Sequence, residues 1–291
     1  MSTLNIQHFF DSQSNTYSYV AFDSASKEAV VIDPVLDFDP ASGCSSTLQA
    51  EQIVRWIKSE GLLLKYILET HVHADHLTAA PFIQSQCGGK TAIGSAITEV
   101  QTVFAKLFGA EEQFVCDGRQ FDLLLADGAE LPLGNLKIRV IHTPGHTPAC
   151  VSYLIADAVF VGDTLFMPDF GTARCDFPGG DAETLYESIQ KLFSLPDNTR
   201  MMMCHDYGAP GRADFAFETT VAQQKARNIH VGAAQSAEHF VMMRRQRDAT
   251  LAMPKLLLPA VQVNMRAGHW PQPDANGISY LKLPINLFCK K

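Results

Sequence analysis

The sequence predicts an α/β fold in which strands form a sandwich and bring metal-binding side chains together at one edge. Three observations lead to this prediction. Short apolar segments with strand character alternate with segments whose apolar residues recur at helical spacing. Histidine or aspartate side chains follow shortly after four of these strand-like segments. The chain has 291 residues, 46% of them hydrophobic, so it can bury a substantial core without disulfide bonds.

The first third of the chain is expected to form a β-hairpin, a helix and a further strand. β-branched and aromatic residues favour the strands, and polar turn residues separate the first two. Apolar residues at near-helical spacing favour the helix, which a glycine ends. The expected elements are strands at 17–22 and 29–32, a helix from Leu48 to the residue before Gly61, and a strand at 65–69.

The next part of the chain is expected to contain two helices and then several strands. Each helix ends at a glycine, which tolerates the backbone conformation that follows a helix C-terminus. The expected ranges are helices at 77–86 and 95–108, and strands at 137–141, 151–155, 159–161 and 200–204.

We divide the chain into a catalytic domain over residues 1–230 and a C-terminal extension over residues 231–291. After about residue 230 the pattern changes to a helix-like stretch rich in Gln, Arg and His, followed by several prolines. The sequence contains no internal repeat, and no flexible linker separates the two parts. We expect the extension to pack on the catalytic domain or on a second subunit. The second alternative would make the protein a homodimer.

Composition argues against several classes of partner. A formal net charge of −8 gives no general basic surface for nucleic acid or for an anionic membrane. No apolar stretch is long enough to span a bilayer. A secretory or mitochondrial signal would need basic residues near its start, but the first basic residue is Lys27. Seven scattered cysteines without a CxxC pair favour free thiols. We therefore expect a cytoplasmic protein, of bacterial origin.

Metal-binding side chains are concentrated in the segment 70–76. A single histidine is more often a structural or surface residue than a ligand, but a cluster of them would pack poorly in a core without a metal. Imidazoles and carboxylates are the ligands that zinc, iron or manganese need. The candidate ligands are His71, His73, Asp75 and His76 in this segment, and His146, Asp163 and His205 further along the chain.

This ordered series of residues resembles the metallo-β-lactamase superfamily over about residues 10–230. The matching pattern is His71-x-His73-x-Asp75-His76, then His146, Asp163 and His205. The resemblance implies a four-layer αβ/βα sandwich with the metal site at one edge of the paired sheets. The superfamily includes hydrolases, oxidoreductases and nucleases, so the fold alone leaves the reaction open.

Within the superfamily the chain looks most like the glutathione-dependent persulfide dioxygenases, also called sulfur dioxygenases, and next most like the glyoxalase II thioesterases. Three local motifs favour the dioxygenases. They are Gly171-x-x-Arg174-Cys175-Asp176-Phe177, in which Cys175 replaces the usual threonine, His205-Asp206-Tyr207, and Asn264-Met265-Arg266.

The dioxygenase resemblance implies one Fe(II) per chain, held by His71, His146 and Asp163. Two histidines and a carboxylate on one face leave open positions for the persulfide sulfur and dioxygen. The other four candidates, His73, Asp75, His76 and His205, would orient these ligands or handle protons and water. The implied reaction converts glutathione persulfide and O2 to sulfite and glutathione, as in sulfide detoxification.

The thioesterase resemblance uses the same side chains for two metals, zinc or a mixture of zinc, iron and manganese. A hydroxide shared by the metals would attack the thioester carbonyl of a hydroxyacylglutathione. One metal would bind His71, His73 and His146, the other Asp75, His76 and His205, and Asp163 would bridge them. Every ligand for this arrangement is present, so ligand identity does not separate the two hypotheses. A catalytically silent binding module is a third alternative.

Both enzyme hypotheses expect a glutathione-like substrate whose carboxylates need cationic or hydrogen-bonding partners. The motifs suggest Arg174, with Tyr207 and Arg227 as further candidates. The alternative for Arg174 is an ion pair with Asp176 or Asp169 that shapes its loop. Cys175 is interpreted as a small loop residue rather than as a sulfur-relay nucleophile.

Overall fold

The computed structural model describes residues 3–287. Its strands are β1 (Leu4–Asp11), β2 (Thr16–Asp23), β3 (Glu28–Ile32), β4 (Val35–Asp39), β5 (Cys44–Ser46), β6 (Leu63–Leu68), β7 (Leu77–Thr78), β8 (Lys90–Gly94), β9 (Leu123–Leu125), β10 (Glu130–Leu133), β11 (Leu136–His142), β12 (Val151–Ile155), β13 (Ala158–Phe160), β14 (Arg200–Met202) and β15 (Glu218–Thr220). Its helices are α1 (Leu48–Ser59), α2 (Ala80–Cys87), α3 (Ile97–Phe108), α4 (Ala182–Phe193), α5 (Val221–Arg227), α6 (Ala237–Asp248) and α7 (Leu257–Asn264).

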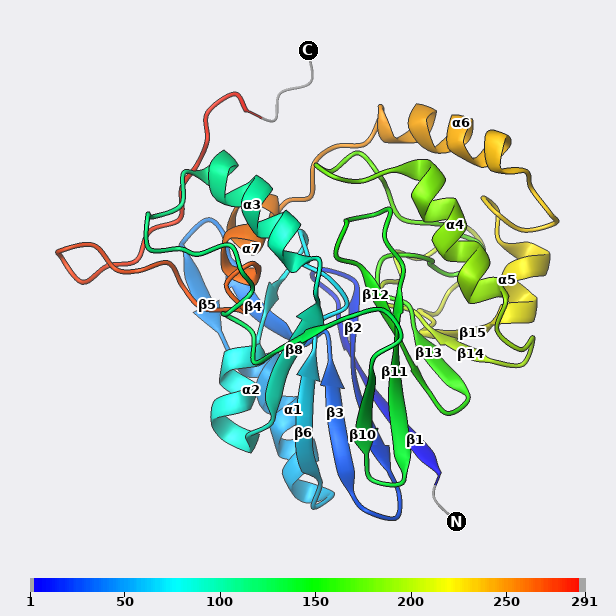
Figure 1. Cartoon of the computed structure of the whole chain (residues 1–291), viewed down its shortest axis with the longest axis horizontal. Helices are drawn as coiled ribbons and strands as arrows, with labels where there is room; N and C mark the ends of the chain where they lie inside the picture. The colour runs from blue at the N-terminus through cyan, green and yellow to red at the C-terminus, as the bar shows by residue number, and fades with distance from the viewer. Residues whose placement is uncertain (1–2, 288–291) are drawn as a thin grey trace.

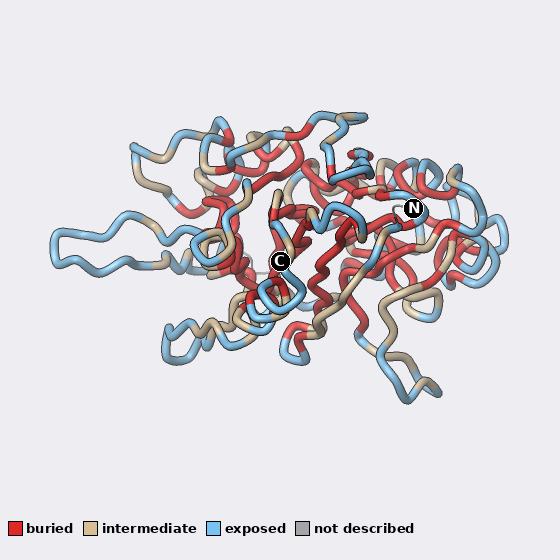
Figure 2. Tube along the Cα trace, turned by 90° about the horizontal axis from the view of Figure 1, so that it is seen from below, coloured by how far each residue is buried: buried red, intermediate tan, exposed pale blue. Residues whose placement is uncertain are grey.

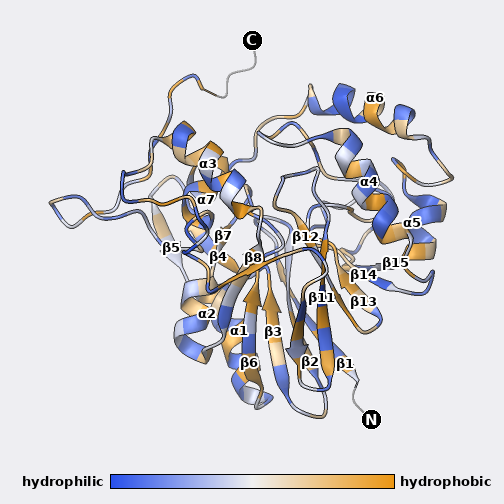
Figure 3. Ribbon diagram, viewed as in Figure 1, coloured by the Kyte–Doolittle hydropathy of each residue, from blue (hydrophilic) through white to orange (hydrophobic). Residues whose placement is uncertain are grey.

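Two six-stranded sheets pack face to face at the centre of the molecule (Figure 1). The first has the order β1-β2-β3-β6-β8-β9, and the second has the order β10-β11-β12-β13-β14-β15. Tyr19 and Ile32 of the first sheet and Val140 and Tyr153 of the second belong to one buried cluster between them. The strands are accordingly the most hydrophobic parts of the chain in Figure 3. A third, small sheet has the order β5-β4-β7.

Helices cover the outer faces of both sheets, which completes the predicted four-layer αβ/βα sandwich (Figure 1). Ile53 of α1 and Ile83 of α2 pack on the first sheet together with Val31. On the second sheet, Leu185 and Ile189 of α4 join a cluster that also includes residues of α6. Buried segments therefore run through the middle of the molecule, and exposed loops surround them (Figure 2).

The predicted hairpin is confirmed, because β2 and β3 pair antiparallel with Tyr19 opposite Ile32. The predicted strand at 65–69 and the predicted helix from Leu48 also correspond to β6 and α1. The helix predicted at 77–86 is wrong at its start. Residues Leu77 and Thr78 instead form β7, which pairs with β4, and α2 begins only at Ala80.

Helix α4 was not among the predicted elements, although its sequence carries ordinary helix signals. The side chain of Asp181 caps the helix by accepting the backbone N–H of Thr184 at 2.8 Å. Leu185, Ile189 and Leu192 then recur at helical spacing and are fully buried.

The two helices after residue 230 pack on the rest of the chain. Helix α6 lies against α4, and α7 lies against β7 and α3 (Figure 1). The separation of this extension from a catalytic domain stays a prediction.

None of the helices in the described part of the chain is long and apolar enough to cross a membrane. Six cysteines within residues 3–287 are free, and Cys289 lies outside the described residues.

Asn264, at the end of α7, fixes the loop that follows β6. Its side-chain nitrogen donates hydrogen bonds to the backbone carbonyls of His73 and His76, at 2.9 and 2.8 Å. Its side-chain oxygen accepts the backbone N–H of Thr78 at 2.9 Å. Three backbone groups of one loop therefore depend on a single buried amide.

Asn264→Ala would leave those three backbone groups without a partner in a buried place. We expect the free energy of unfolding to fall by about 2–4 kcal/mol, because each unsatisfied buried polar group costs energy. Urea denaturation in the presence of a chelator would measure this without a contribution from bound metal. Asn276→Ala is the matched control, since Asn276 is exposed and its side-chain amide bonds to Tyr280. Equal, small effects of both substitutions would contradict the assignment.

Candidate metal centre

Four strands end at the same edge of the sandwich and deliver the predicted ligands there. β6 leads to His71, β11 to His146, β13 to Asp163 and β14 to His205. These four side chains are buried, and an ion-pair distance to Asp163 connects each of the three histidines with it. The prediction that residues distant in sequence meet at one edge is thus confirmed.

His71 and His146 point corresponding nitrogens at the same carboxylate oxygen. Their Nε2 atoms lie 3.9 and 3.7 Å from Oδ2 of Asp163. Nδ1 of His146 lies 2.7 Å from the carbonyl oxygen of Arg174 and donates a hydrogen bond to it, so Nε2 is the nitrogen that faces Asp163. Nδ1 of His71 contacts the hydroxyl of Thr70 at 3.1 Å. Both rings are therefore held by partners on the side away from Asp163.

Gly145 allows the His146 loop to lie directly against α4. Its φ is +132°, and an added Cβ would fall 2.4 Å from backbone atoms of Leu185. The carbonyl of Gly145 also accepts the backbone N–H of Asp181, the residue that caps α4, at 2.8 Å. A larger residue at 145 would displace His146 from the centre.

His205 connects Asp163 with Asp75. Its Nε2 lies 3.2 Å from Oδ1 of Asp163 and 3.4 Å from Oδ2 of Asp75. Asp75 in turn lies 3.5 Å from Nδ1 of His76. Asp75 and His76 could hold a metal ion together with His73, as a second group beside that of His71, His146 and Asp163.

His73 is completely buried and contacts two further buried carboxylates. Its Nε2 is 3.0 Å from Asp33 and 3.7 Å from Glu69. Asp33 also accepts the backbone N–H and the hydroxyl of Thr70, at 2.7 and 2.9 Å. One carboxylate therefore orients His73 directly and His71 through Thr70. Asp33 and Glu69 were not among the residues predicted from the sequence.

Charge is distributed unevenly among the buried groups. Burial and the neighbouring His73 hold the pKa of His71 well below its usual range, so this ring is neutral and able to bind a metal. Burial opposes charge on His73 and His205 as well. Asp33 and Glu69 nevertheless raise the pKa of His73 to about 9, and Asp75 and Asp163 raise that of His205 to about 10. Against burial, His205, His71 and His146 hold the pKa of Asp163 well below its usual range.

These residues fit a metal ion on both chemistry and geometry. One ligand atom from each of His71, His146 and Asp163 lies within 4.8 Å of the others, which a single ion can span. Nε2 of His71 and Oδ1 of Asp163 are buried and have no hydrogen-bond partner among residues 3–287. A bound cation would satisfy these atoms and would replace protons on the histidines.

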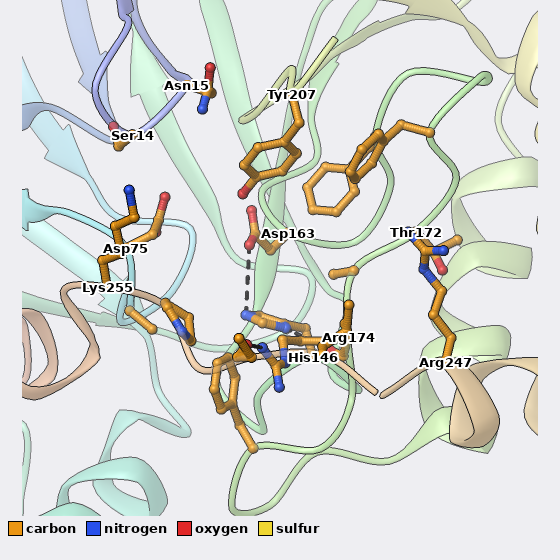
Figure 4. Close-up of a pocket in the computed structure, with 18 of the residues that line it drawn as sticks. Ser14, Asn15, Asp75, His146, Asp163, Thr172, Arg174, Tyr207, Arg247 and Lys255 are labelled. Carbon is orange, nitrogen blue, oxygen red and sulfur yellow. Dashed lines mark hydrogen bonds and ion pairs between the residues drawn. The ribbon is translucent and has the colours of Figure 1, made fainter. Parts of the chain in front are cut away.

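A cavity of about 390 Å³ opens onto Asp163 and His146 (Figure 4). Phe166, Phe170 and Tyr207 form one wall, with Tyr207 packed at ring distances of 5.6 Å from Phe166 and 5.0 Å from Phe170. The site can therefore accept an organic molecule with an apolar part next to the candidate ligands.

The structure brings two of the three predicted substrate-binding residues to this cavity. Tyr207 lines it, stacks on His205 with ring centroids 5.4 Å apart, and directs its hydroxyl toward Asp163 (Figure 4). Arg174 also lines it, but it is bound to both oxygens of Asp176, at 2.6 and 2.7 Å. Arg227 is exposed at the end of α5 and is not among the lining residues described. Burial raises the pKa of the Cys175 thiol, in keeping with an inert loop residue.

Three cations that line the cavity were missed from the sequence, and they are Arg244, Arg247 and Lys255. Arg247 lies in the last turn of α6, and Lys255 lies in the segment between α6 and α7. The run Arg244-Arg245-x-Arg247 was a visible signal, but only the packing of α6 shows which of these side chains faces the cavity.

Three relatives span almost the whole chain. A probable metallo-hydrolase of Burkholderia pseudomallei (strain 1710b) is 52% identical and covers 97% of this chain and 99% of its own. Glyoxylase B2 of Dictyostelium discoideum is 46% identical over 97% of both chains. The mitochondrial persulfide dioxygenase ETHE1 of Bos taurus is 32% identical over 92% of this chain and 91% of its own.

A solved structure and a family model agree with these relatives. The crystal structure of ETHE1 from Myxococcus xanthus has a TM-score of 0.72 and 32% identity, and it covers 91% of this chain and 100% of that chain. Residues 12–205 match the model of the metallo-β-lactamase superfamily, and this range includes all seven candidate ligands. The chain therefore belongs to the metallo-β-lactamase superfamily.

Proposed function

We propose that the protein is a persulfide dioxygenase with one Fe(II) per chain. In this reaction glutathione persulfide, O2 and water give glutathione and sulfite, with release of two protons. The relative from Bos taurus carries this activity in its name. The motifs at Arg174, at Tyr207 and at Asn264 supply the rest of the resemblance.

One observation carries the proposal: two of the three residues of one ligand group line the cavity, but only one residue of the second group does. His146 and Asp163 line it and belong to the group that includes His71. Of the second group, Asp75 lines the cavity, whereas His73 and His76 are not among the lining residues described. A substrate in the cavity would therefore contact more of the two-histidine, one-carboxylate set than of the second group. Such a set is typical of non-haem iron oxygenases.

His71, His146 and Asp163 would hold the iron, which when bound supplies redox chemistry that zinc lacks. The residues around this set would keep it in place. The carbonyl of Arg174 orients His146, and Asp33 acts on His71 through Thr70. His205 lies 3.2 Å from Oδ1 of Asp163 and would accept or return protons near that carboxylate.

Tyr207 would contribute a hydrogen bond to the reacting sulfur. Burial, Asp75 and Asp163 raise its pKa well above its usual range, so its hydroxyl stays protonated and is a donor. The hydroxyl faces the cavity beside Asp163 (Figure 4). An anionic persulfide in the cavity would therefore meet a hydrogen-bond donor beside the candidate ligands.

A two-metal thioesterase is the second candidate, and specific observations favour it. His73, Asp75 and His76 form a second possible ligand group, and Nδ1 of His73 is buried without a hydrogen-bond partner among the described residues. Two relatives are named as a metallo-hydrolase and as a glyoxylase.

We expect protein reconstituted with iron under anaerobic conditions to consume O2 when glutathione persulfide is added. An oxygen electrode and sulfite analysis would measure one sulfite for each O2, as the stoichiometry requires. S-lactoylglutathione is the matched substrate for the thioesterase. Rapid hydrolysis of that thioester without O2 uptake on the persulfide would decide for the second candidate.

Asp163→Ala and His73→Ala should differ in iron affinity. Removing Asp163 deletes the carboxylate that both His71 and His146 face, so we expect iron binding to be lost. Removing His73 should weaken binding by about 10–100-fold, as is typical of residues that orient ligands, and excess iron should still load the site. Anaerobic titration followed by metal analysis would measure both. Equal loss of iron in the two variants would support a two-metal site.

A further inference from the structure

Two loops meet at the aromatic wall of the cavity. Phe166 and Phe170 lie between β13 and α4, and Tyr207 lies between β14 and β15. The centroid of the Tyr207 ring is 5.6 Å from that of Phe166 and 5.0 Å from that of Phe170. Tyr207 is nevertheless 40% exposed, so ring packing covers only part of it. The position of Tyr207 therefore also depends on how the two loops are joined.

The guanidinium group of Arg212 joins the two loops. Its Nε and Nη2 donate to the carboxylate of Asp169 at 2.8 and 3.3 Å. Its Nη1 and Nη2 donate to the two carboxylate oxygens of Asp206, with Nη2 at 2.6 Å. Within the described part of the chain, the pair with Asp169 is the only hydrogen-bonded contact between residues 166–171 and residues 206–216.

Each of these two carboxylates directly precedes a ring of the wall. Asp169 precedes Phe170, and Asp206 precedes Tyr207. Asp206 is completely buried and also accepts the backbone N–H of Gly208 at 3.0 Å, so it is fixed within its own loop. The side chain of Asp169 is 41% exposed and belongs to the other loop. The pair between Arg212 and Asp169 thus holds one ring next to the other.

We infer that Arg212 is a positioning residue, which holds Phe170 and Tyr207 together as one wall of the cavity. A planar guanidinium can bind two carboxylates at once, whereas a lysine ammonium is a single point of charge on a flexible chain. With the wall in place, the hydroxyl of Tyr207 is directed toward Asp163 (Figure 4). The effect of Arg212 on catalysis rests on the proposed function, but its connection of the two loops does not.

Asp169→Ala removes the connection and leaves the buried pair between Arg212 and Asp206 in place. Because Asp169 is partly exposed, the variant should fold. We expect kcat/KM with glutathione persulfide to fall about threefold to fivefold, which is the size of effect of a partly exposed ion pair. Asp169→Glu keeps the carboxylate and should restore most of the activity. Arg212→Lys should resemble Asp169→Ala, since it keeps a charge beside Asp206 but loses the second pair.

Asp157→Ala is the matched control. Asp157 accepts from Nε and Nη2 of Arg200 at 3.0 and 3.4 Å, which is the same arrangement as in the pair of Arg212 and Asp169. It precedes β13, whereas Asp163 follows that strand, so it lies at the end of the strand away from the cavity. The control should leave kcat/KM unchanged.

Hydrogen–deuterium exchange of the metal-loaded protein, measured by mass spectrometry without substrate, reports on the loops directly. The amides of residues 206–216 should exchange faster in Asp169→Ala than in wild-type protein, because the loop that contains them has lost its contact with residues 166–171. Asp157→Ala should exchange like wild-type protein over the same residues.

Tyr207→Phe tests whether the connection acts through the tyrosine hydroxyl. If Asp169→Ala misplaces this hydroxyl, the double variant Asp169→Ala/Tyr207→Phe should lose less activity than the product of the two single losses. A connection with only a general structural role would give the full product. Unchanged amide exchange, unchanged kcat/KM in Asp169→Ala, or fully multiplicative losses would each overturn the inference.

Failure of the inference is distinguishable from failure of the proposed function. If wild-type protein shows no O2 uptake with glutathione persulfide, the proposed function fails, and the same variants are compared in the hydrolysis of S-lactoylglutathione. If O2 uptake is observed while Asp169→Ala behaves like Asp157→Ala in activity and in amide exchange, the role of Arg212 alone is wrong.

Discussion

The burial of many imidazoles and carboxylates at one sheet edge is the constraint on which the rest of the structure depends. His73 and His205 are completely buried, and burial alone would keep such rings neutral. Carboxylates at 3.0–3.4 Å reverse that preference. Because uncompensated charge in this place would be strongly destabilising, each group needs an opposite charge, a hydrogen bond or a metal ion. The neighbouring elements supply these partners.

The residues after 230 contribute to both the centre and its cavity. Asn264 bonds to the backbone of the ligand loop at His73, His76 and Thr78, so α7 stabilises the segment that carries most of the candidate ligands. Arg247 in α6 and Lys255 before α7 add positive charge at the cavity. Substitution of Arg247 or Lys255 would therefore change the charge of the cavity, whereas substitution of Asn264 would change the loop that carries the ligands.

The sequence predicted the parts that depend on local patterns, and it missed those that depend on tertiary contacts. Strand ends followed by His71, His146, Asp163 and His205 were enough to predict a shared edge. The start of α2 was wrong because pairing of Leu77 and Thr78 with β4, a tertiary contact, outweighs their helical spacing. The position of Arg247 and the burial of Asp33 and Glu69 likewise follow from packing between elements. The residue types alone do not show how these elements pack.

The number of metal ions per chain tests the central claim most directly. Native mass spectrometry of protein reconstituted with Fe(II) under anaerobic conditions, together with elemental analysis, would count them. A centre built from His71, His146 and Asp163 predicts one iron per chain, with no second ion retained at stoichiometric metal. Two ions per chain, bound with similar affinity, would contradict the account and would place His73, Asp75 and His76 among the ligands of a binuclear hydrolase.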